Sequence, residues 1–257
     1  PSVGATENLL IAAAGPPAET KITGAAAEPE ISDLLAYLRG CGALIESQPD
    51  GAILVQGREA LTGCCCHAIL PDRIEAATYL AAAAITGGEI TVYASPEHLA
   101  APLAALRRMG CRITTGEQSI TLTAPEHLQG AGSIVTLPYP GFPTDLQAIF
   151  MALAAAAEGY TAFTETVFPR RWAHVEELRR LGADITVVGS HAVIRGAPLI
   201  GSALTCTDLR AGAAVVLAAL AAKGESTVTA ISHIERGYAD FVPTLRHLGA
   251  DIYLTEV

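Results

Sequence analysis

The segment Pro138–Gln147 carries the pattern of residues that most clearly suggests chemistry. It has the sequence PYPGFPTDLQ, with three prolines and one glycine in its first six residues. Such a segment cannot form a regular helix or strand, so we expect a stiff, bent loop. An alanine-rich apolar run, 148–157, follows at once. The pattern therefore predicts a rigid loop that ends at a helix N-terminus, with the carboxylate of Asp145 beside it.

Asp145 allows two interpretations. A Thr or Asp at the start of a helix commonly caps it, because the side-chain oxygen accepts a hydrogen bond from a backbone N–H that has no partner in the helix. In the second interpretation, the loop directs the carboxylate and the helix N-terminus into a cleft. There the carboxylate could act as a base beside a bound anion.

Two further predicted helix starts carry similar side chains. Asp72 and Arg73 precede one apolar run, and Thr207-Asp208-Leu209-Arg210 stand at the start of another. A helix N-terminus carries about half a positive charge and unpaired N–H groups. If the three helices run parallel, their N-termini share one face, and that face would suit a phosphorylated ligand.

A fourfold repeat organises the elements that must position these residues. Each copy has a short amphipathic helix, then a glycine, then an apolar segment, and the glycines 42, 110, 182 and 249 are 68, 72 and 67 residues apart. We expect each glycine to end its helix in the left-handed conformation, after which the chain turns into a strand. The apolar positions 31, 34, 35 and 38, then 99, 103 and 106, and then 241, 245 and 248 have helical spacing.

A second kind of helix, apolar on nearly every face, is predicted upstream of each amphipathic helix, at 8–14, 74–85, 146–157 and 209–222. Such helices must be enclosed by the rest of their domain. The predicted fold is α/β, built of βαβαββ-type units with central buried helices. Residues 70–257 hold three units and form one domain. Residues 1–69 hold one unit, which cannot enclose its own apolar helix, so we expect an incomplete domain with a further segment before Pro1.

Composition excludes several classes of protein. Of the 257 residues, 51% are apolar and 16% charged, which is not the composition of a disordered chain. The formal charge of −10 argues against a nucleic-acid partner. No apolar run approaches the ~20 residues that span a bilayer, and no signal peptide is recognisable. We expect a soluble, cytoplasmic protein without a membrane partner, whose six cysteines are not a disulfide framework.

These motifs together resemble the enolpyruvyl transferases, most closely the branch that uses UDP-N-acetylglucosamine. The resemblance spans the whole chain, and the loop at 138–147 is its most specific motif. The motifs are Ser2–Asn8, Glu28–Ile31, Pro71–Ala76, Pro138–Gln147, Thr207–Gly212 and His233–Tyr238. The branch that acts in the shikimate pathway would share the fold but not these motifs.

The resemblance implies two domains of three units each, of the inside-out α/β barrel type, around a cleft that closes on its substrates. This chain would be the last unit of the first domain and nearly all of the second. The preceding part would carry a lysine, several arginines and a loop cysteine, and none of the six cysteines here matches that cysteine. The family uses no metal and no organic cofactor.

The implied reaction transfers enolpyruvyl from phosphoenolpyruvate to the 3′-hydroxyl of UDP-N-acetylglucosamine, by addition and then elimination of phosphate, at the start of peptidoglycan synthesis. By resemblance, Asp145 is the base that takes the hydroxyl proton, and Asp208 and Leu209 line the reacting centre. Arg236 would grip phosphoenolpyruvate, a task that suits guanidinium because its planar fork pairs two oxygens and keeps its charge.

Further residues are implied to bind the UDP-sugar. Ser2, Val3, Gly4 and Val167 would hold it largely through backbone groups, and Arg171 corresponds to a cleft arginine of the family. The chain departs from the family near Arg171, because it has Phe-Pro-Arg-Arg-Trp at 168–172 where Phe-Glu-Asn-Arg-Phe is usual. The lost acid and the added arginine put the local charge and the shape of this loop in question.

Alternative interpretations remain open at this point. Asp208 could be only a helix cap, and Arg236 only a solvated arginine. Cys64, Cys65, Cys66 and His67 suggest a zinc site, but no second ligand pair has zinc-site spacing. His67, His174 and His233 are interpreted as packing or surface residues. The whole chain could also be a non-catalytic UDP-sugar-binding or assembly module, and the reading frame upstream of Pro1 would discriminate that from an enzyme.

Overall fold

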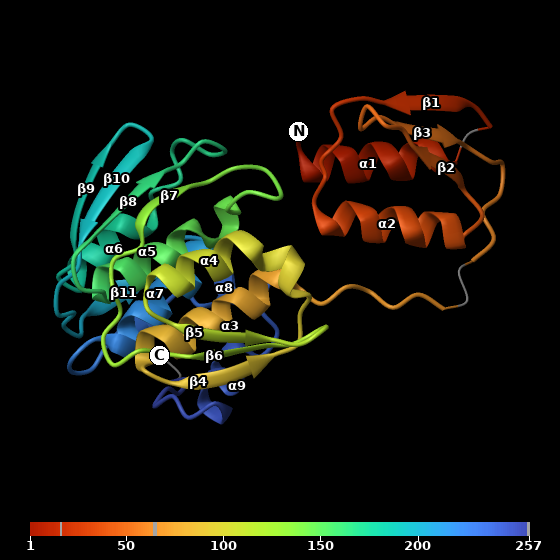
Figure 1. Cartoon of the computed structure of the whole chain (residues 1–257). Coiled ribbons are helices and arrows are strands. Elements are labelled where there is room, and N and C mark those ends of the chain that lie inside the picture. The colour runs from red at the N-terminus through yellow and green to blue at the C-terminus, as the bar shows by residue number, and fades with distance from the viewer. Residues whose placement is uncertain (16, 64–65, 256–257) are drawn as a thin grey trace. The chain divides into compact units, whose positions relative to one another are not determined.

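The computed structural model describes residues 1–15, 17–63 and 66–255, and it divides into two compact units (Figure 1). Unit 1 comprises Pro1–Pro71 and Pro138–Pro140, and unit 2 comprises Asp72–Leu137 and Gly141–Val257. Each unit has its own hydrophobic core. That unit 1 is the last repeat of a longer domain stays a prediction.

Unit 1 is a single repeat, in which two helices pack beside a small antiparallel sheet of order β1-β3-β2. The fully buried side chains of Leu10 and Val55 lie in its core. Its elements are α1 (Val3–Ala14), β1 (Glu19–Ile22), α2 (Pro29–Gly40), β2 (Leu44–Ser47) and β3 (Ile53–Gln56).

Helix α1 extends beyond the apolar run 8–14 back to Val3, where Ser2 caps it by accepting a hydrogen bond from the Ala5 N–H. Although α1 is apolar, unit 1 covers only one side of it. Leu9 and Ile11 are 52% and 58% exposed. This agrees with the expectation that one repeat cannot enclose its own apolar helix.

Unit 2 holds three repeats and three separate sheets, of order β4-β6-β5, β7-β8-β10-β9 and β11-β12. Its helices are α3 (Arg73–Thr86), η1 (Pro96–Leu99), α4 (Ala100–Arg108), η2 (Thr144–Leu146), α5 (Gln147–Ala156), α6 (His174–Arg180), α7 (Leu209–Ala221), α8 (Ser232–Glu235) and α9 (Phe241–His247). Its strands are β4 (Glu89–Val92), β5 (Arg112–Thr115), β6 (Ile120–Thr123), β7 (Gly132–Val135), β8 (Tyr160–Thr164), β9 (Asp184–Val188), β10 (His191–Arg195), β11 (Ala203–Thr205) and β12 (Thr227–Thr229).

The repeated α/β fold with buried helices is confirmed. Helices α3, α5 and α7 pack against one another in the middle of unit 2, with the sheets around them (Figure 1). Every residue of α5 except Ala156 is buried. Within the described part of unit 2 the three sheets are not joined by hydrogen bonds into a closed barrel.

The predicted turns are confirmed at all four repeat glycines, Gly42, Gly110, Gly182 and Gly249, whose φ angles are 94°, 95°, 95° and 101°. In each repeat the N–H after the glycine donates to the carbonyl of a helical leucine five residues back, with N···O distances of 3.0–3.1 Å. This bond pattern closes the helix and requires a left-handed residue, a conformation that glycine adopts without steric cost.

The last repeat differs from the prediction. Residues 251–255 form no strand, and β12 pairs only with β11. A strand needs a hydrogen-bonded neighbour, and the described chain contains no third strand in this repeat. Leu248, which was expected on the buried face of α9, is therefore 50% exposed, whereas its counterpart Leu181, in the repeat that contains β9 and β10, is fully buried.

Candidate active site

A hollow of about 500 Å³ opens in unit 2, where the N-terminal ends of α5 and α7 meet α8. It contains three arginines and two aspartates. It is lined by Asp145, Arg171, Thr207, Asp208, Leu209, Arg210, His233 and Arg236. The five predicted site residues 145, 171, 208, 209 and 236 thus share one cavity.

Asp145 is not a helix cap. It lies in η2, immediately before α5, and no side chain caps either helix. Its carboxylate is instead held between two guanidinium groups, with Oδ1 2.7 Å from Arg171 Nη1 and Oδ2 3.3 Å from Arg210 Nη2. The carboxylate is 39% exposed toward the cavity.

The two arginines control the charge state of Asp145. Burial acts to raise the pKa of this carboxyl group, but the charges and hydrogen bonds of Arg210 and Arg171 outweigh burial and hold the pKa below its usual value. Asp145 is therefore ionised at neutral pH. Each guanidinium takes one acceptor site of the carboxylate, and the remaining lone pairs can accept a proton from a bound hydroxyl.

Arg171 is positioned by its own loop. Its Nη1 also donates to Thr144 Oγ1 at 3.2 Å, and its guanidinium lies over the Phe168 ring. Its backbone carbonyl accepts from the buried Gln147 side chain. The unusual residues at 168–172 thus still bring the arginine to the cavity, with Trp172 Nε1 donating to the carbonyl of Gly189.

A buried carboxylate that the sequence did not point to supports this corner of the site. Glu165 is fully buried and follows β8. Its Oε1 accepts from Thr136 Oγ1 and from the N–H groups of Val167 and Phe168, at 2.8, 2.8 and 2.9 Å. Its Oε2 accepts from Thr144 Oγ1 at 2.9 Å. Four donors satisfy the charge, so Glu165 fixes the loop that carries Arg171.

Asp208 does cap its helix, as the simpler interpretation held. Its Oδ1 accepts from the N–H groups of Arg210 and Ala211, each at 2.8 Å. Capping and lining the cavity are compatible, because the helix start itself faces the cavity. The cap also sets the first turn of α7, and so the direction from which Arg210 reaches Asp145.

Arg236 follows α8 and is brought to the cavity by close packing. The neighbouring Gly237 leaves no room for a side chain, since a Cβ there would lie 2.6 Å from Leu209 Cδ2. Among the residues that the structure describes, the side chain of Arg236 has no hydrogen-bond or ion-pair partner. Its guanidinium is thus available to an anion.

Four predicted sugar-binding residues are not among the residues that line this cavity. Ser2, Val3 and Gly4 form the start of α1 in unit 1. Val167 is in unit 2 but does not line the cavity, and its N–H is bound to Glu165. The structure therefore groups the candidate catalytic residues with Arg171 and Leu209 in unit 2, whereas Ser2, Val3 and Gly4 belong to unit 1.

The two histidines of unit 2 discussed above have different surroundings. His174 is buried, with Nε2 3.0 Å from Met151 Sδ, and burial lowers its pKa to about 4. It is a packing residue, as interpreted. His233 lines the cavity, which the sequence did not indicate.

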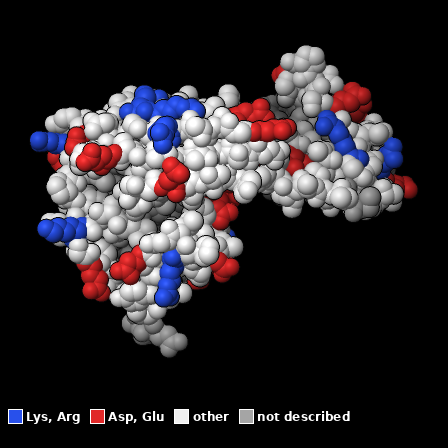
Figure 2. Space-filling view, turned by 60° about the horizontal axis from the view of Figure 1, so that its bottom comes forward, with Lys and Arg blue, Asp and Glu red and all other residues white. Residues whose placement is uncertain are grey.

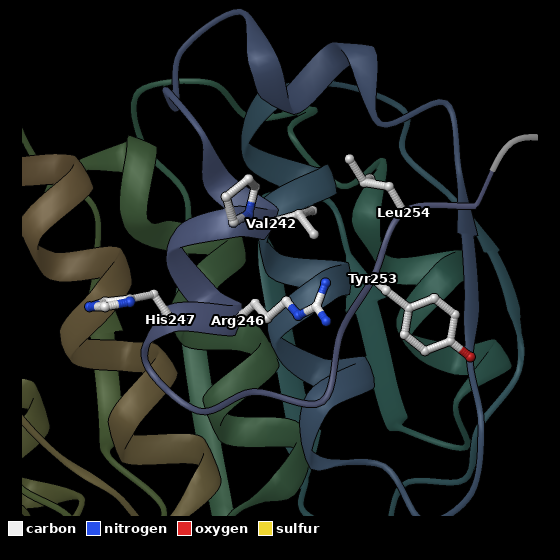
Figure 3. Close-up of a pocket in the computed structure, with 6 residues that line it drawn as sticks. Val242, Arg246, His247, Tyr253 and Leu254 are labelled. Carbon is white, nitrogen blue, oxygen red and sulfur yellow. The ribbon is translucent and has the colours of Figure 1, made fainter.

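A second hollow, of about 490 Å³, lies between α9 and the C-terminal segment. Figure 3 shows the Arg246 side chain extending from α9 toward Tyr253, with Val242 and Leu254 nearby. Among the described residues, its walls are mainly apolar and include no carboxylate. It offers no pairing of acid and base, so we place the chemistry in the first cavity.

Other surfaces add no site. Acidic and basic side chains are interspersed over the face seen in Figure 2, with broad uncharged areas between them. Within residues 1–15, 17–63 and 66–255, no group of three His, Cys, Asp or Glu side chains could hold a metal ion, and no helix is long and apolar enough to cross a membrane. Cys64 and Cys65, of the suggested zinc motif, lie outside the described residues, and Cys66 is exposed.

The repeated α/β units and the cavity at their helix N-termini define a protein of the enolpyruvyl transferase class. A family model described as EPSP synthase (3-phosphoshikimate 1-carboxyvinyltransferase) matches residues 1–245. The chain therefore belongs to this family.

Several relatives are more specific in their names. The chain is 49% identical over 98% of its length to UDP-N-acetylglucosamine 1-carboxyvinyltransferase 1 of Symbiobacterium thermophilum. It is 47% identical over 98% to the UDP-N-acetylglucosamine 1-carboxyvinyltransferase of Synechocystis, and 46% identical over its whole length to that of Finegoldia magna. The chain spans 57%, 58% and 61% of the lengths of these three relatives.

Solved structures confirm the fold. The crystal structure of the enolpyruvyl transferase NikO from Streptomyces tendae matches 97% of this chain with a TM-score of 0.88 and 30% identity, over 60% of its own length. EPSP synthase from Acinetobacter baumannii matches the whole chain with a TM-score of 0.73, over 62% of its own length, but at 20% identity it supports the fold alone.

Proposed function

We propose that this chain supplies the second-domain part of the active site of an enzyme that transfers enolpyruvyl from phosphoenolpyruvate to the 3′-hydroxyl of UDP-N-acetylglucosamine. The observation that carries the proposal is the ionised Asp145, held by two arginines in a cavity that also contains the unpaired Arg236. The reaction would be the first committed step of peptidoglycan synthesis, in the cytoplasm.

The roles are those that the family resemblance implies, and the charges of the cavity residues support them. In the addition step, the 3′-oxygen forms a bond to C2 of phosphoenolpyruvate while C3 gains a proton, and Asp145 takes the hydroxyl proton. In the elimination step, C3 loses a proton and the bond from C2 to the phosphate oxygen breaks, which releases phosphate. Arg236 would bind the anionic phosphoenolpyruvate, and Asp208 and Leu209 would line the reacting centre.

The acceptor is inferred from the relatives. Those named for UDP-N-acetylglucosamine are 46–49% identical to this chain, whereas the EPSP synthase structure is 20% identical. We assign the UDP-sugar to Ser2, Val3, Gly4, Val167 and Arg171, as the resemblance implies. Because Asp145, Arg171 and Arg236 can serve any enolpyruvyl acceptor, they do not by themselves discriminate a UDP-sugar from 3-phosphoshikimate.

We propose further that the isolated chain does not catalyse enolpyruvyl transfer. About two-fifths of the length of the Symbiobacterium thermophilum relative has no counterpart in it, and the resemblance assigns a lysine and a loop cysteine to that part. The half-exposed apolar residues Leu9 and Ile11 on α1 are a surface that this part would cover.

The test compares the 257-residue chain with a fusion in which the unmatched part of the Symbiobacterium thermophilum relative is joined to it. Phosphate release is measured with phosphoenolpyruvate and either UDP-N-acetylglucosamine or 3-phosphoshikimate. We expect release only from the fusion and only with the UDP-sugar. If phosphate is released with 3-phosphoshikimate and not with UDP-N-acetylglucosamine, the assignment of the acceptor is wrong. If the isolated chain releases phosphate, the proposal that activity requires the unmatched part is wrong.

A further inference from the structure

A chain of buried hydrogen bonds leads from the central helix α3 to the carboxylate of Asp145. Arg210 Nη2 donates to Asp145 Oδ2 at 3.3 Å, and Arg210 Nη1 donates to the Tyr238 hydroxyl at 3.1 Å. The Tyr238 hydroxyl is 2.9 Å from Thr78 Oγ1, on α3. Tyr238 and Thr78 are 1% and 0% exposed, so water does not compete for the bond between them.

The direction of each bond in this chain is determined by the number of protons. Thr78 Oγ1 donates its one proton to the Ile74 carbonyl at 2.9 Å, so it can only accept from Tyr238. Tyr238 therefore donates its one proton to Thr78 and presents lone pairs to Arg210, which only donates. Burial raises the pKa of Tyr238 despite the lowering effect of Arg210, so the hydroxyl keeps this proton.

This chain of bonds supplies most of the restraint on the position of the Arg210 guanidinium. Its contact with Asp145 is a single N–H at 3.3 Å, which is long for a charged pair. An arginine side chain loses much rotamer freedom when it is held in one geometry. The Tyr238 hydroxyl and the stacking of the guanidinium over the Tyr238 ring, at 5.5 Å, supply the restraint.

We propose that Tyr238 and Thr78 are positioning residues that hold Arg210 against Asp145 Oδ2 and so set how strongly this carboxylate binds a proton. Neither residue lines the cavity, so both would act through Arg210. The catalytic meaning of this restraint rests on the proposed role of Asp145, but the restraint itself does not.

Other charged and titratable groups also face Asp145 or its arginines, and they must stay in place in any test. They belong to the segments before α5 and α6, to the end of β8, and to α3, α6, α7 and α8. These groups are Arg171, Glu165, Asp72, His174, Asp208, His233 and Arg236.

The experiment measures the pKa of Asp145 by a pH titration of the ¹³C resonance of its carboxyl carbon in the 257-residue chain, with Asp145→Asn to assign the signal. In Tyr238→Phe and Thr78→Val, we expect Arg210 to leave Asp145 for part of the time, so that the pKa rises. Arg210→Gln removes the guanidinium altogether, so it should give the largest rise in the pKa of Asp145, roughly one unit or more.

Two variants serve as controls. Thr78→Ser keeps the acceptor oxygen, and Tyr79→Phe removes a neighbouring buried hydroxyl that lies outside this chain of bonds. Both should leave the pKa of Asp145 unchanged. The proposal is overturned if Tyr238→Phe and Thr78→Val leave the pKa unchanged or lower it, or if Tyr79→Phe raises it equally. If Tyr238→Phe does not fold, as judged by circular dichroism, the matched pair Thr78→Val and Thr78→Ser decides.

A second measurement separates this inference from the proposed function. In the fusion protein, the acidic limb of the profile of kcat against pH should move in Thr78→Val by the same amount as the pKa of Asp145. If the pKa moves but the limb does not, positioning stands and the role of Asp145 as the base fails.

Discussion

The carboxylate oxygen Oδ1 of Asp145 lies 2.7 Å from Nη1 of Arg171, a residue 26 positions away in the chain. This contact replaces the local helix-capping bond that an aspartate at a helix entrance commonly makes. The carboxylate is therefore directed into the cavity, where it is ionised and partly exposed. The predictions below test what this arrangement does.

Replacing Asp145 by Asn removes the proton acceptor and keeps the shape of the side chain. In the fusion protein, we expect turnover to fall by on the order of a hundredfold or more while binding of UDP-N-acetylglucosamine largely survives. Steady-state phosphate release and calorimetric titration measure the two quantities. Asp184→Asn, at an exposed position of β9, is the control. Unchanged turnover would remove Asp145 from the mechanism.

Replacing Arg236 by Ala should weaken binding of phosphoenolpyruvate. The guanidinium has no partner among the described residues, so its charge is available to the ligand, and its loss should raise the Kd roughly tenfold or more. Calorimetric titration of the fusion protein measures this. Arg246→Ala is the control, because it removes one positive charge from the second hollow and not from the cavity of Arg236. Equal weakening by both variants would show a general effect of net charge.

Replacing Glu165 by Gln should destabilise unit 2. An amide accepts at one atom only, so at least one of the four donors on Glu165 would lose its partner or face an N–H group. Leaving a buried donor unpaired costs about 1–3 kcal/mol in the free energy of unfolding. Urea unfolding measures the change, with the exposed Glu117→Gln as the control. Equal stability of the two variants would contradict the role given to Glu165.

His174 should make the chain less stable as the pH falls. Burial lowers its pKa to about 4 from the usual 6.5, so the unfolded chain binds a proton more readily than the folded chain. This contribution to stability is complete above about pH 6.5 and is lost progressively toward pH 4, by roughly 3 kcal/mol at most. Replacing His174 by Leu should flatten this part of the profile of unfolding free energy against pH. Identical slopes in the two proteins would contradict it.

Gly212 should resist the substitution that normally strengthens a helix. Replacing a glycine inside a helix by alanine commonly stabilises it by up to about 1 kcal/mol. A Cβ at Gly212, in α7, would instead lie 2.9 Å from Ile234 Cγ1 and 3.0 Å from Cys206 Sγ. Gly212→Ala should therefore lower the melting temperature and displace α8, which precedes Arg236. Gly4→Ala in α1, where a Cβ meets nothing within 4 Å, is the matched control and should not destabilise. A higher melting temperature for Gly212→Ala would refute the packing argument.

Local features of the chain could be predicted because their causes are local. The turns at Gly42, Gly110, Gly182 and Gly249 are closed by hydrogen bonds between residues five apart. The caps at Asp72 and Asp208 act over two and three residues. The apolar composition of α3, α5 and α7 required their burial, and the starts of α5 and α7 meet at the cavity. The sequence by itself thus determined the repeat, the α/β class and the face that carries the site.

Only the tertiary structure decided which partners the site residues have. Asp145 meets Arg210 across 65 positions, and Tyr238 meets Thr78 across 160. Such contacts depend on how three helices and two loops pack, and no local propensity specifies that packing. The same cause explains the exposed Leu248 and the buried Glu165. Hydrophobic spacing predicts which face of an element is apolar, whereas neighbours that are distant in the sequence decide whether that face is covered and whether a buried charge is satisfied.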